Sequence, residues 1–85
     1  MELSPESTQP IVNRLKRARG QLDGILRMLD EGRDCEDIVT QLAAVSKAID
    51  RAGFSLVATG LKQCMLDPDN HLDTAKMEKL FLSLA

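Results

Sequence analysis

The sequence lacks the residues that build large aromatic cores. It has no Trp, no Tyr and only two Phe among its 85 residues, so the interior must be built from aliphatic side chains. A chain of this length buries one small core, which argues against a large enzyme pocket. The sequence also has no apolar run of roughly 18 residues, so we expect no membrane-spanning helix.

Cysteine is scarce as well, with two residues in the whole chain. The first residues lack the basic and apolar regions of a secretion signal, so a cytoplasmic location is expected. Two cysteines in that compartment are expected to be thiols and not a structural disulfide. Neither cysteine has a Cys-His-Asp arrangement near it in sequence, and there is no glycine-rich phosphate loop. These absences make an enzyme the weakest functional candidate.

The apolar residues that are present recur with helical spacing, and no stretch alternates as a strand does. Two short breaks, at residues 32–34 and 67–70, divide the chain. The sequence therefore predicts an all-α fold, with a flexible N-terminal arm over residues 1–9 and one helical domain over residues 10–85. The expected helices cover about residues 10–31, 35–66 and 71–84.

Local signals support the ends of these helices. Pro10 suits a first helical turn because its missing N–H costs nothing there, and Gly32 suits a C-terminal cap. Asp34 is a good N-cap for the second helix. The sole histidine, His71, is expected to be an exposed residue at the start of the third helix.

Apolar residues form seams that are longer than one small chain can bury. The first seam contains Ile11, Leu15, Ala18, Leu22, Ile25 and Leu29. The second contains Cys35, Ile38, Leu42, Val45, Ile49, Ala52 and Leu56. An antiparallel pair of such hairpins forms a four-helix bundle that covers both stripes. We therefore expect a three-helix protomer that forms an obligate dimer or a higher oligomer.

The two cysteines are placed at opposite ends of the second predicted helix. Cys35 and Cys64 are 29 residues apart, which is about eight whole turns and roughly 43 Å of continuous helix. They share one face but are too far apart for an intrachain disulfide. In an antiparallel dimer, Cys35 of one chain comes level with Cys64 of the other. Cys35, in a first helical turn, is the expected nucleophile. The alternative is that both are buried apolar side chains.

A basic stretch near the start of the chain is hidden by the overall charge of −2. Between positions 11 and 20 it has no acidic residue and four cations: Arg14, Lys16, Arg17 and Arg19. Lys47 and Arg51, one turn apart on the second helix, extend this surface. Such a surface binds phosphates, and without aromatic residues to stack on bases it favours double-stranded DNA. The alternative is a solvated charged face.

Four segments carry a resemblance to a known family. They are residues 13–25 (NRLKRARGQLDGI), 28–31 (MLDE), 34–35 (DC) and 41–45 (QLAAV). They resemble the copper-, nickel/cobalt- and formaldehyde-sensing repressors of the CsoR/RcnR/FrmR family, over about residues 10–66. The resemblance implies a DNA-binding repressor built from a dimer of antiparallel hairpins, which assembles into a tetramer with inducer sites between subunits.

The resemblance also identifies candidate inducer positions. The family's inducer-binding positions fall on Cys35, Gly60 and Cys64. Copper sensors of the family have Cys-His-Cys there, but Gly60 has no side chain that can ligate a metal. The tyrosine that copper sensors carry just before the first Cys is Asp34 here. A pair of thiols without the histidine resembles the persulfide-sensing branch of the family.

Three hypotheses follow. The leading one is a repressor that leaves duplex operator DNA when persulfides or other reactive sulfur species react with the Cys35/Cys64 pair, with no metal or cofactor. The second keeps the repressor but makes Cu(I) the inducer, because two thiolates bind a soft cuprous ion. The third, from a different class, is an oligomeric helical adaptor whose cysteines only fill space.

Overall fold

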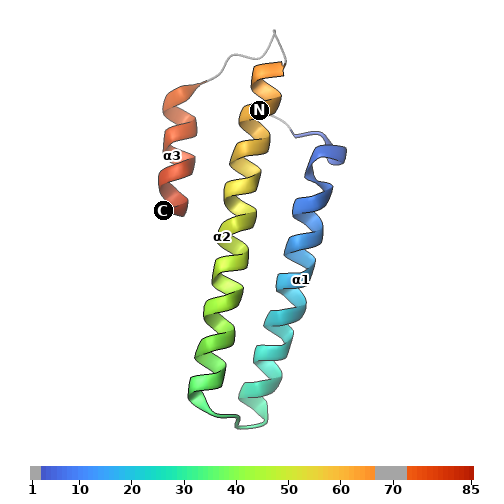
Figure 1. Ribbon diagram of the computed structural model, residues 1–85, viewed down its shortest axis with the longest axis vertical. Coiled ribbons are helices and arrows are strands. Elements are labelled where there is room, and N and C mark those ends of the chain that lie inside the picture. Colours follow the sequence, from blue (N-terminus) through green and yellow to red (C-terminus); the bar gives the residue numbers. More distant parts are fainter. Residues whose placement is uncertain (1–2, 67–72) are drawn as a thin grey trace.

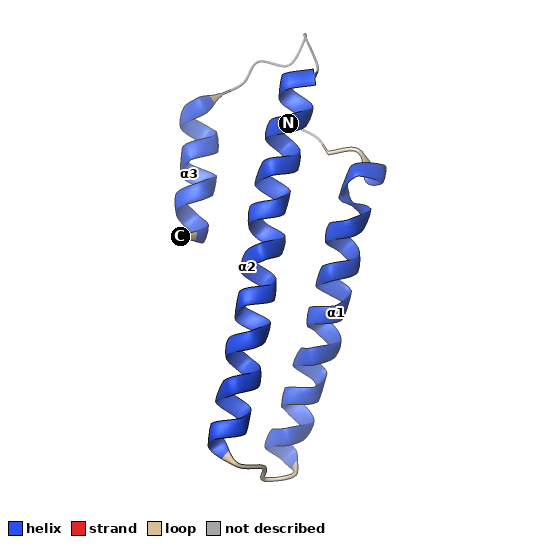
Figure 2. Ribbon diagram, viewed as in Figure 1, coloured by secondary structure: helices blue, strands red, loops and turns tan. Residues whose placement is uncertain are grey.

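Three helices account for most of the residues that the structure describes. The computed structural model describes residues 3–66 and 73–85. Its helices are α1 (Pro5–Asp30), α2 (Cys35–Leu66) and α3 (Thr74–Leu84). Helices α1 and α2 form a long antiparallel hairpin, and α3 runs back beside the C-terminal half of α2 (Figure 1). The two described ranges contain no strand (Figure 2), so the all-α prediction is confirmed for them.

The protomer is a single layer of helices. Its Cα atoms span 54 × 25 × 12 Å. Two stacked layers would be thicker, because packed helix axes lie about 8–10 Å apart and each Cα cylinder has a radius of about 2.3 Å. The faces above and below this layer are therefore covered by none of the three described helices. No helix in the described part of the chain has both the length and the hydropathy to cross a membrane.

Helix α1 begins at Pro5, well before the predicted start at Pro10. The predicted boundary of the N-terminal arm is therefore wrong over residues 5–9, which are helical. The start signal is a Ser-Pro pair. Ser4 is the N-cap and its Oγ accepts a hydrogen bond from the backbone N of Ser7 at 3.4 Å. Pro5, with a fixed φ and no N–H, occupies the first helical position after this N-cap, where both properties are favourable.

The turn between α1 and α2 contains the predicted C-terminal glycine. Gly32 has a φ of +67°, the left-handed conformation that ends many helices. In the same turn, the backbone N of Arg33 donates to the carbonyl of Met28 at 3.0 Å. Helix α2 then begins at Cys35, as predicted, and continues without interruption to Leu66.

Helix α3 begins at Thr74, later than the predicted start. Asp73 is its N-cap, and its Oδ1 accepts a hydrogen bond from the backbone N of Lys76 at 3.1 Å. A carboxylate at this position accepts a hydrogen bond from a backbone N–H and interacts favourably with the positive end of the helix dipole. The break predicted at residues 67–70 and the predicted position of His71 lie outside the described residues.

Packing of α3 against α2 depends on a small residue. The rings of Phe54 and Phe81 meet edge to face, with centroids 5.2 Å apart and an angle of 64° between the planes. Met77 is buried in the same contact region. A Cβ placed on Gly53 would lie 2.7 Å from Leu84 Cδ2. Gly53 therefore allows the end of α3 to approach α2 closely.

The predicted apolar seams are only half buried. Ile11, Ala18 and Ile25 of α1 are buried, as are Val45 and Ala52 of α2. The intervening seam positions are exposed over 40% to 57% of their surface: Leu15, Leu22, Leu29, Leu42, Ile49 and Leu56. On each helix these exposed residues recur every seventh position, so they form one stripe along α1 and one along α2. We call these six residues the aliphatic face.

Candidate functional site

The two thiols have different environments at opposite ends of α2. Cys35 is the first residue of the helix and is exposed, whereas Cys64 is buried with 6% of its surface accessible. Because α2 is continuous between them, their Cα atoms are about 43 Å apart. A disulfide needs Cα atoms within roughly 7 Å, so the two thiols of one chain cannot react with each other. A site that uses both thiols requires a second copy of the chain.

The donor set around the thiols is small. Among residues 3–66 and 73–85, no group of three or more His, Cys, Asp and Glu residues is placed to hold a metal ion. Gly60, one turn before Cys64, is buried and supplies no ligand atom. Two thiolates fit a soft, low-coordinate ion such as Cu(I) by their chemistry, but only when they come from two chains.

An apolar cavity lies beside Gly60. It has a volume of about 190 Å³ and is lined by Leu3, Leu56, Val57, Gly60, Met77 and Leu80. The lining comes from α2, from α3 and from the residue just before the α1 N-cap. Where the resemblance expects a histidine, the structure therefore has a glycine beside an apolar cavity.

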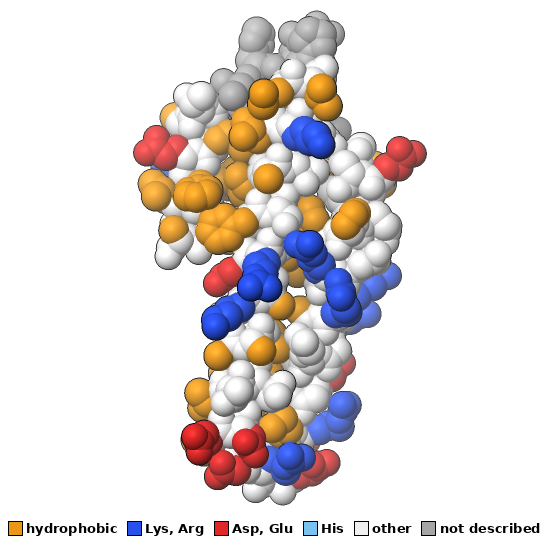
Figure 3. Space-filling view, viewed as in Figure 1, with side chains coloured by type: hydrophobic (Ala, Val, Ile, Leu, Met, Phe, Trp, Pro, Cys, Tyr) orange, Lys and Arg blue, Asp and Glu red, His pale blue; other side chains and the backbone are white. Residues whose placement is uncertain are grey.

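The structure brings three of the six predicted basic residues together. Arg14 and Arg17 of α1 and Arg51 of α2 line one groove of about 330 Å³. Its remaining lining residues are Ala18, Gln21 and Ala48. We call this the arginine groove. In the space-filling view, Lys and Arg side chains gather midway along α1 and α2 (Figure 3).

The other three predicted cations are exposed but do not line the arginine groove. They are Lys16, Arg19 and Lys47. Among the described residues, no carboxylate is within ion-pairing distance of any of the six. Arg14 is held by a hydrogen bond, in which its Nη1 donates to Ser55 Oγ of α2 at 3.1 Å. Ser55 was not among the predicted residues, because contacts between distant positions leave no trace in local spacing.

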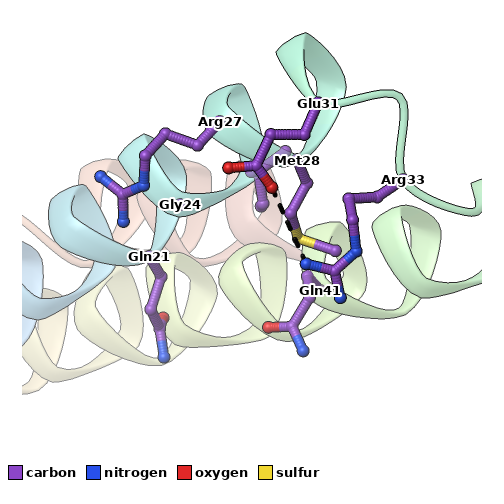
Figure 4. Close-up of a pocket in the computed structure, with 8 residues that line it drawn as sticks. Gln21, Gly24, Arg27, Met28, Glu31, Arg33 and Gln41 are labelled. Carbon is purple, nitrogen blue, oxygen red and sulfur yellow. Dashed lines mark ion pairs between the residues drawn. The ribbon is translucent and has the colours of Figure 1, made fainter.

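A second groove continues towards the α1–α2 turn (Figure 4). It has a volume of about 390 Å³, and Gln21 lines both this groove and the arginine groove. Arg27 and Arg33 also line it, and Arg33 Nη1 lies 3.9 Å from Glu31 Oε2. Both partners of that ion pair are more than half exposed, so it contributes little stability. Acidic side chains gather at this end of the hairpin (Figure 3), so its charge is mixed, unlike that of the arginine groove.

The aliphatic face and the arginine groove lie on different sides of the hairpin. Successive residues of an α-helix are rotated by about 100°. Arg17 is therefore about 200° around α1 from Leu15, and Arg51 is about 180° around α2 from Leu42. A partner that covers the aliphatic face leaves the arginine groove accessible.

Comparison with known proteins fits these features. A family described as "Metal-sensitive transcriptional repressor" matches residues 7–84. The chain belongs to this family. The family resemblance stated from the sequence is thereby confirmed at the level of the family, while the persulfide-sensing branch is not distinguished by the match.

Individual members of the metal-sensitive repressor family show the same similarity. The copper-sensing transcriptional repressor CsoR of Mycobacterium ulcerans is 45% identical over 53 residues, 62% of this chain and 45% of the relative. The copper-sensing repressor RicR of Mycobacterium tuberculosis is 38% identical over 61% of this chain and 54% of the relative. CsoR of Bacillus subtilis is 36% identical over 75% of this chain and 63% of the relative. The match thus spans about half the length of most of these relatives.

Proposed function

We propose that this chain is a transcriptional repressor that binds duplex operator DNA and releases it when Cu(I) is bound by Cys35 of one copy and Cys64 of another. The observation that carries this proposal is the placement of two thiols at opposite ends of one unbroken helix. The names of the relatives, which are called copper-sensing, favour Cu(I) as the inducer.

An antiparallel dimer is the assembly that makes the two thiols one site. When two copies of α2 run in opposite directions, Cys35 of each comes level with Cys64 of the other. The aliphatic face supplies the contact, because it exposes Leu22, Ile49 and their neighbours over about half of their surface and burial of such side chains drives association. Two hairpins joined in this way form a four-helix bundle, and two bundles form a tetramer.

Cu(I) suits this donor set. It is a soft ion that binds thiolates, and two thiolates satisfy its low coordination number. Cys35 and Cys64 would hold it, while Gly60 contributes nothing. The two thiols would hold it from two different subunits, and the assembly held in this way would bind DNA more weakly.

The arginine groove is the proposed DNA-binding surface. Arg14, Arg17 and Arg51 converge on it, and none of them forms an ion pair with a carboxylate of the described residues, so their charges remain available for phosphates. Lys16, Arg19 and Lys47 add to the positive field. Binding dominated by phosphate contacts favours duplex DNA, and its affinity falls steeply as salt rises.

A second candidate inducer is a persulfide, and Gly60 favours it. In that reaction the Cys35 thiolate attacks the outer sulfur of RSSH, which forms a Cys35 persulfide and releases RS⁻. The Cys64 thiolate of a second copy then attacks the Sγ of Cys35 itself, which breaks the Sγ–S bond of the persulfide, forms an intersubunit disulfide and releases the outer sulfur as HS⁻. Neither step needs a third side chain, so the reaction is not impaired by a glycine at position 60.

An anaerobic titration separates these inducers. Fluorescence anisotropy would follow a labelled duplex containing a G/C-rich inverted repeat as Cu(I) or an organic persulfide is added. One Cu(I) per thiol pair should release the wild-type protein, and Cys35→Ser and Cys64→Ser should stay bound. Release by persulfide but not by Cu(I) establishes the second candidate. A chain that never binds the duplex, or that binds it without responding to either compound, is not the proposed sensor.

A further inference from the structure

The N-terminal end of α1 is tied to α2 immediately beside the buried thiol. Gln63 is the residue before Cys64, and its Nε2 donates hydrogen bonds to Ser4 Oγ at 3.2 Å and to Ser7 Oγ. Gln63 and Ser7 are both partly buried. These contacts join positions more than fifty residues apart in the chain. We call Gln63, Ser4 and Ser7 the glutamine latch.

The glutamine latch binds the residues that cap the N-terminal end of α1. Ser4 is the N-cap, and its carbonyl accepts hydrogen bonds from the backbone N of Thr8 at 3.3 Å and from Ser7 Oγ at 2.9 Å. Its Oγ lies 2.8 Å from Ser7 Oγ. Because both serines belong to the first turn, Gln63 fixes the position and the rotation of α1 relative to the end of α2 that carries Cys64.

The same helix carries the arginine groove. Arg14 is seven residues after Ser7, which is two turns or about 10 Å along the same side of α1. It donates to Ser55 of α2 and lines the groove with Arg51. A change in the position of α1 against α2 therefore alters both the Arg14–Ser55 bond and the spacing of the guanidinium groups.

Chemistry at Cys64 is expected to disturb the latch. Cys64 is 6% exposed, and close-packed interiors accept an added atom only when their surroundings move. Gln63 is covalently attached to Cys64 within one rigid helix, so it moves with it. Hydrogen bonds weaken steeply outside a narrow range of distance and angle, so a small movement of this turn breaks them.

We infer that Gln63 is a positioning residue that couples the state of Cys64 to the arginine groove. The inference rests on the proposed function and adds to it the route by which a thiol event reaches α1. The unmodified protein keeps the latch closed and holds α1 in the arrangement that binds DNA. Modification of Cys64 opens the latch and releases the first turns of α1.

The test compares wild type with Gln63→Met, which keeps the length of the side chain and removes the donor. Gln9→Met is the matched control, because Gln9 Nε2 donates to Asn13 Oδ1 within α1 and does not reach α2. For each protein, affinity for the labelled duplex is measured without inducer and with Cu(I) or an organic persulfide. The quantity compared is the ratio of the two affinities.

Before inducer is added, Gln63→Met should bind the duplex at least about fivefold more weakly than wild type. Addition of inducer should then leave the affinity of Gln63→Met unchanged. The ratio therefore falls towards one, while Gln9→Met keeps the wild-type ratio. If Gln63 only stabilises the fold, both affinities fall together and the ratio is unchanged, which overturns the inference. Ser7→Ala removes an acceptor of the same latch and serves as the second variant where Gln63→Met does not fold.

Hydrogen exchange distinguishes failure of the latch from failure of the proposed function. Backbone amides of residues 6–9 and 11–13 should exchange faster in Gln63→Met than in wild type, and faster in wild type after Cys64 is modified. If wild-type affinity does not respond to either inducer, the proposed function fails. If it responds while exchange over these residues is unaffected by both changes, the proposed function stands and the latch is refuted.

Discussion

Cys35 and Cys64 begin and nearly end one unbroken helix, the first exposed and the second buried. Their separation of about 43 Å means that neither can reach the other within a chain. Every reaction or ligand that uses both thiols must therefore link two copies. The positions of the two cysteines therefore predict that a site using both of them forms only between subunits.

The first prediction concerns crosslinking. Oxidation of the wild-type protein with diamide should give a covalent dimer on a non-reducing gel and no intrachain disulfide, because the two thiols of one chain are too far apart. Cys35→Ser and Cys64→Ser alone should give no crosslink between these positions. An equimolar mixture of the two variants, refolded together, should recover crosslinked dimer through its one remaining mixed site. A monomeric product containing both cysteine peptides in a disulfide would contradict the placement.

The aliphatic face leads to a prediction about oligomeric state. Ile49→Glu puts a charge into a surface that we expect to be buried in the dimer, where an unpaired carboxylate costs several kcal/mol, on the order of 3. Sedimentation velocity should show dissociation to smaller species or loss of folded protein. Ala44→Glu is the control, since position 44 lies on the same helix about 200° around from Leu42. Equal behaviour of the two variants would place the interface elsewhere.

The arginine groove leads to a prediction about DNA affinity. Arg17→Ala and Arg51→Ala should each weaken binding to the duplex, and the slope of log affinity against log salt should become shallower by about one unit for each phosphate that the variant no longer neutralises. Fluorescence anisotropy at several NaCl concentrations measures both effects. Lys79→Ala on α3 removes an exposed charge that does not line the groove and should leave the slope unchanged. A slope unaffected by either arginine substitution would exclude the groove as the binding surface.

Two glycines within helices provide a matched test of α3 packing. Gly20 has no atom within 4 Å of an added Cβ, so Gly20→Ala should stabilise the protein by about 0.5–1 kcal/mol through helix propensity. Gly53→Ala gains the same propensity but places Cβ 2.7 Å from Leu84 Cδ2. Leu84 must then move, so the net gain should be smaller or negative. Urea unfolding measures the difference, and equal gains would mean that α3 does not pack closely at Gly53.

Local sequence signals predicted most of the hairpin. The cap at Gly32 and the start of α2 at Cys35 follow from backbone conformation and capping preferences that act within a few residues. The predicted start of α1 at Pro10 is too late, because the helix begins at the Ser4-Pro5 pair. Both prolines suit a first turn, and the deciding contribution is the hydrogen bond from the backbone N of Ser7 to the Ser4 hydroxyl.

The candidate site was predictable only in part. Position and spacing identified both thiols and the basic stretch. They did not show that Arg14, Arg17 and Arg51 share one groove, while Lys16, Arg19 and Lys47 lie outside its lining. That distinction depends on how α1 is rotated against α2. The periodicity of one helix leaves this rotation open.

The sequence by itself determined an all-helical hairpin, a pair of thiols too far apart to meet within one chain, and a concentration of positive charge between positions 11 and 20. These follow from periodicity, the rise per residue and composition. Only the tertiary structure decided which half of each apolar seam is buried, which arginines converge, and that Gln63 holds the cap of α1. Those features arise between residues distant in the chain, where packing and hydrogen bonding across helices select one arrangement among several that local preferences allow.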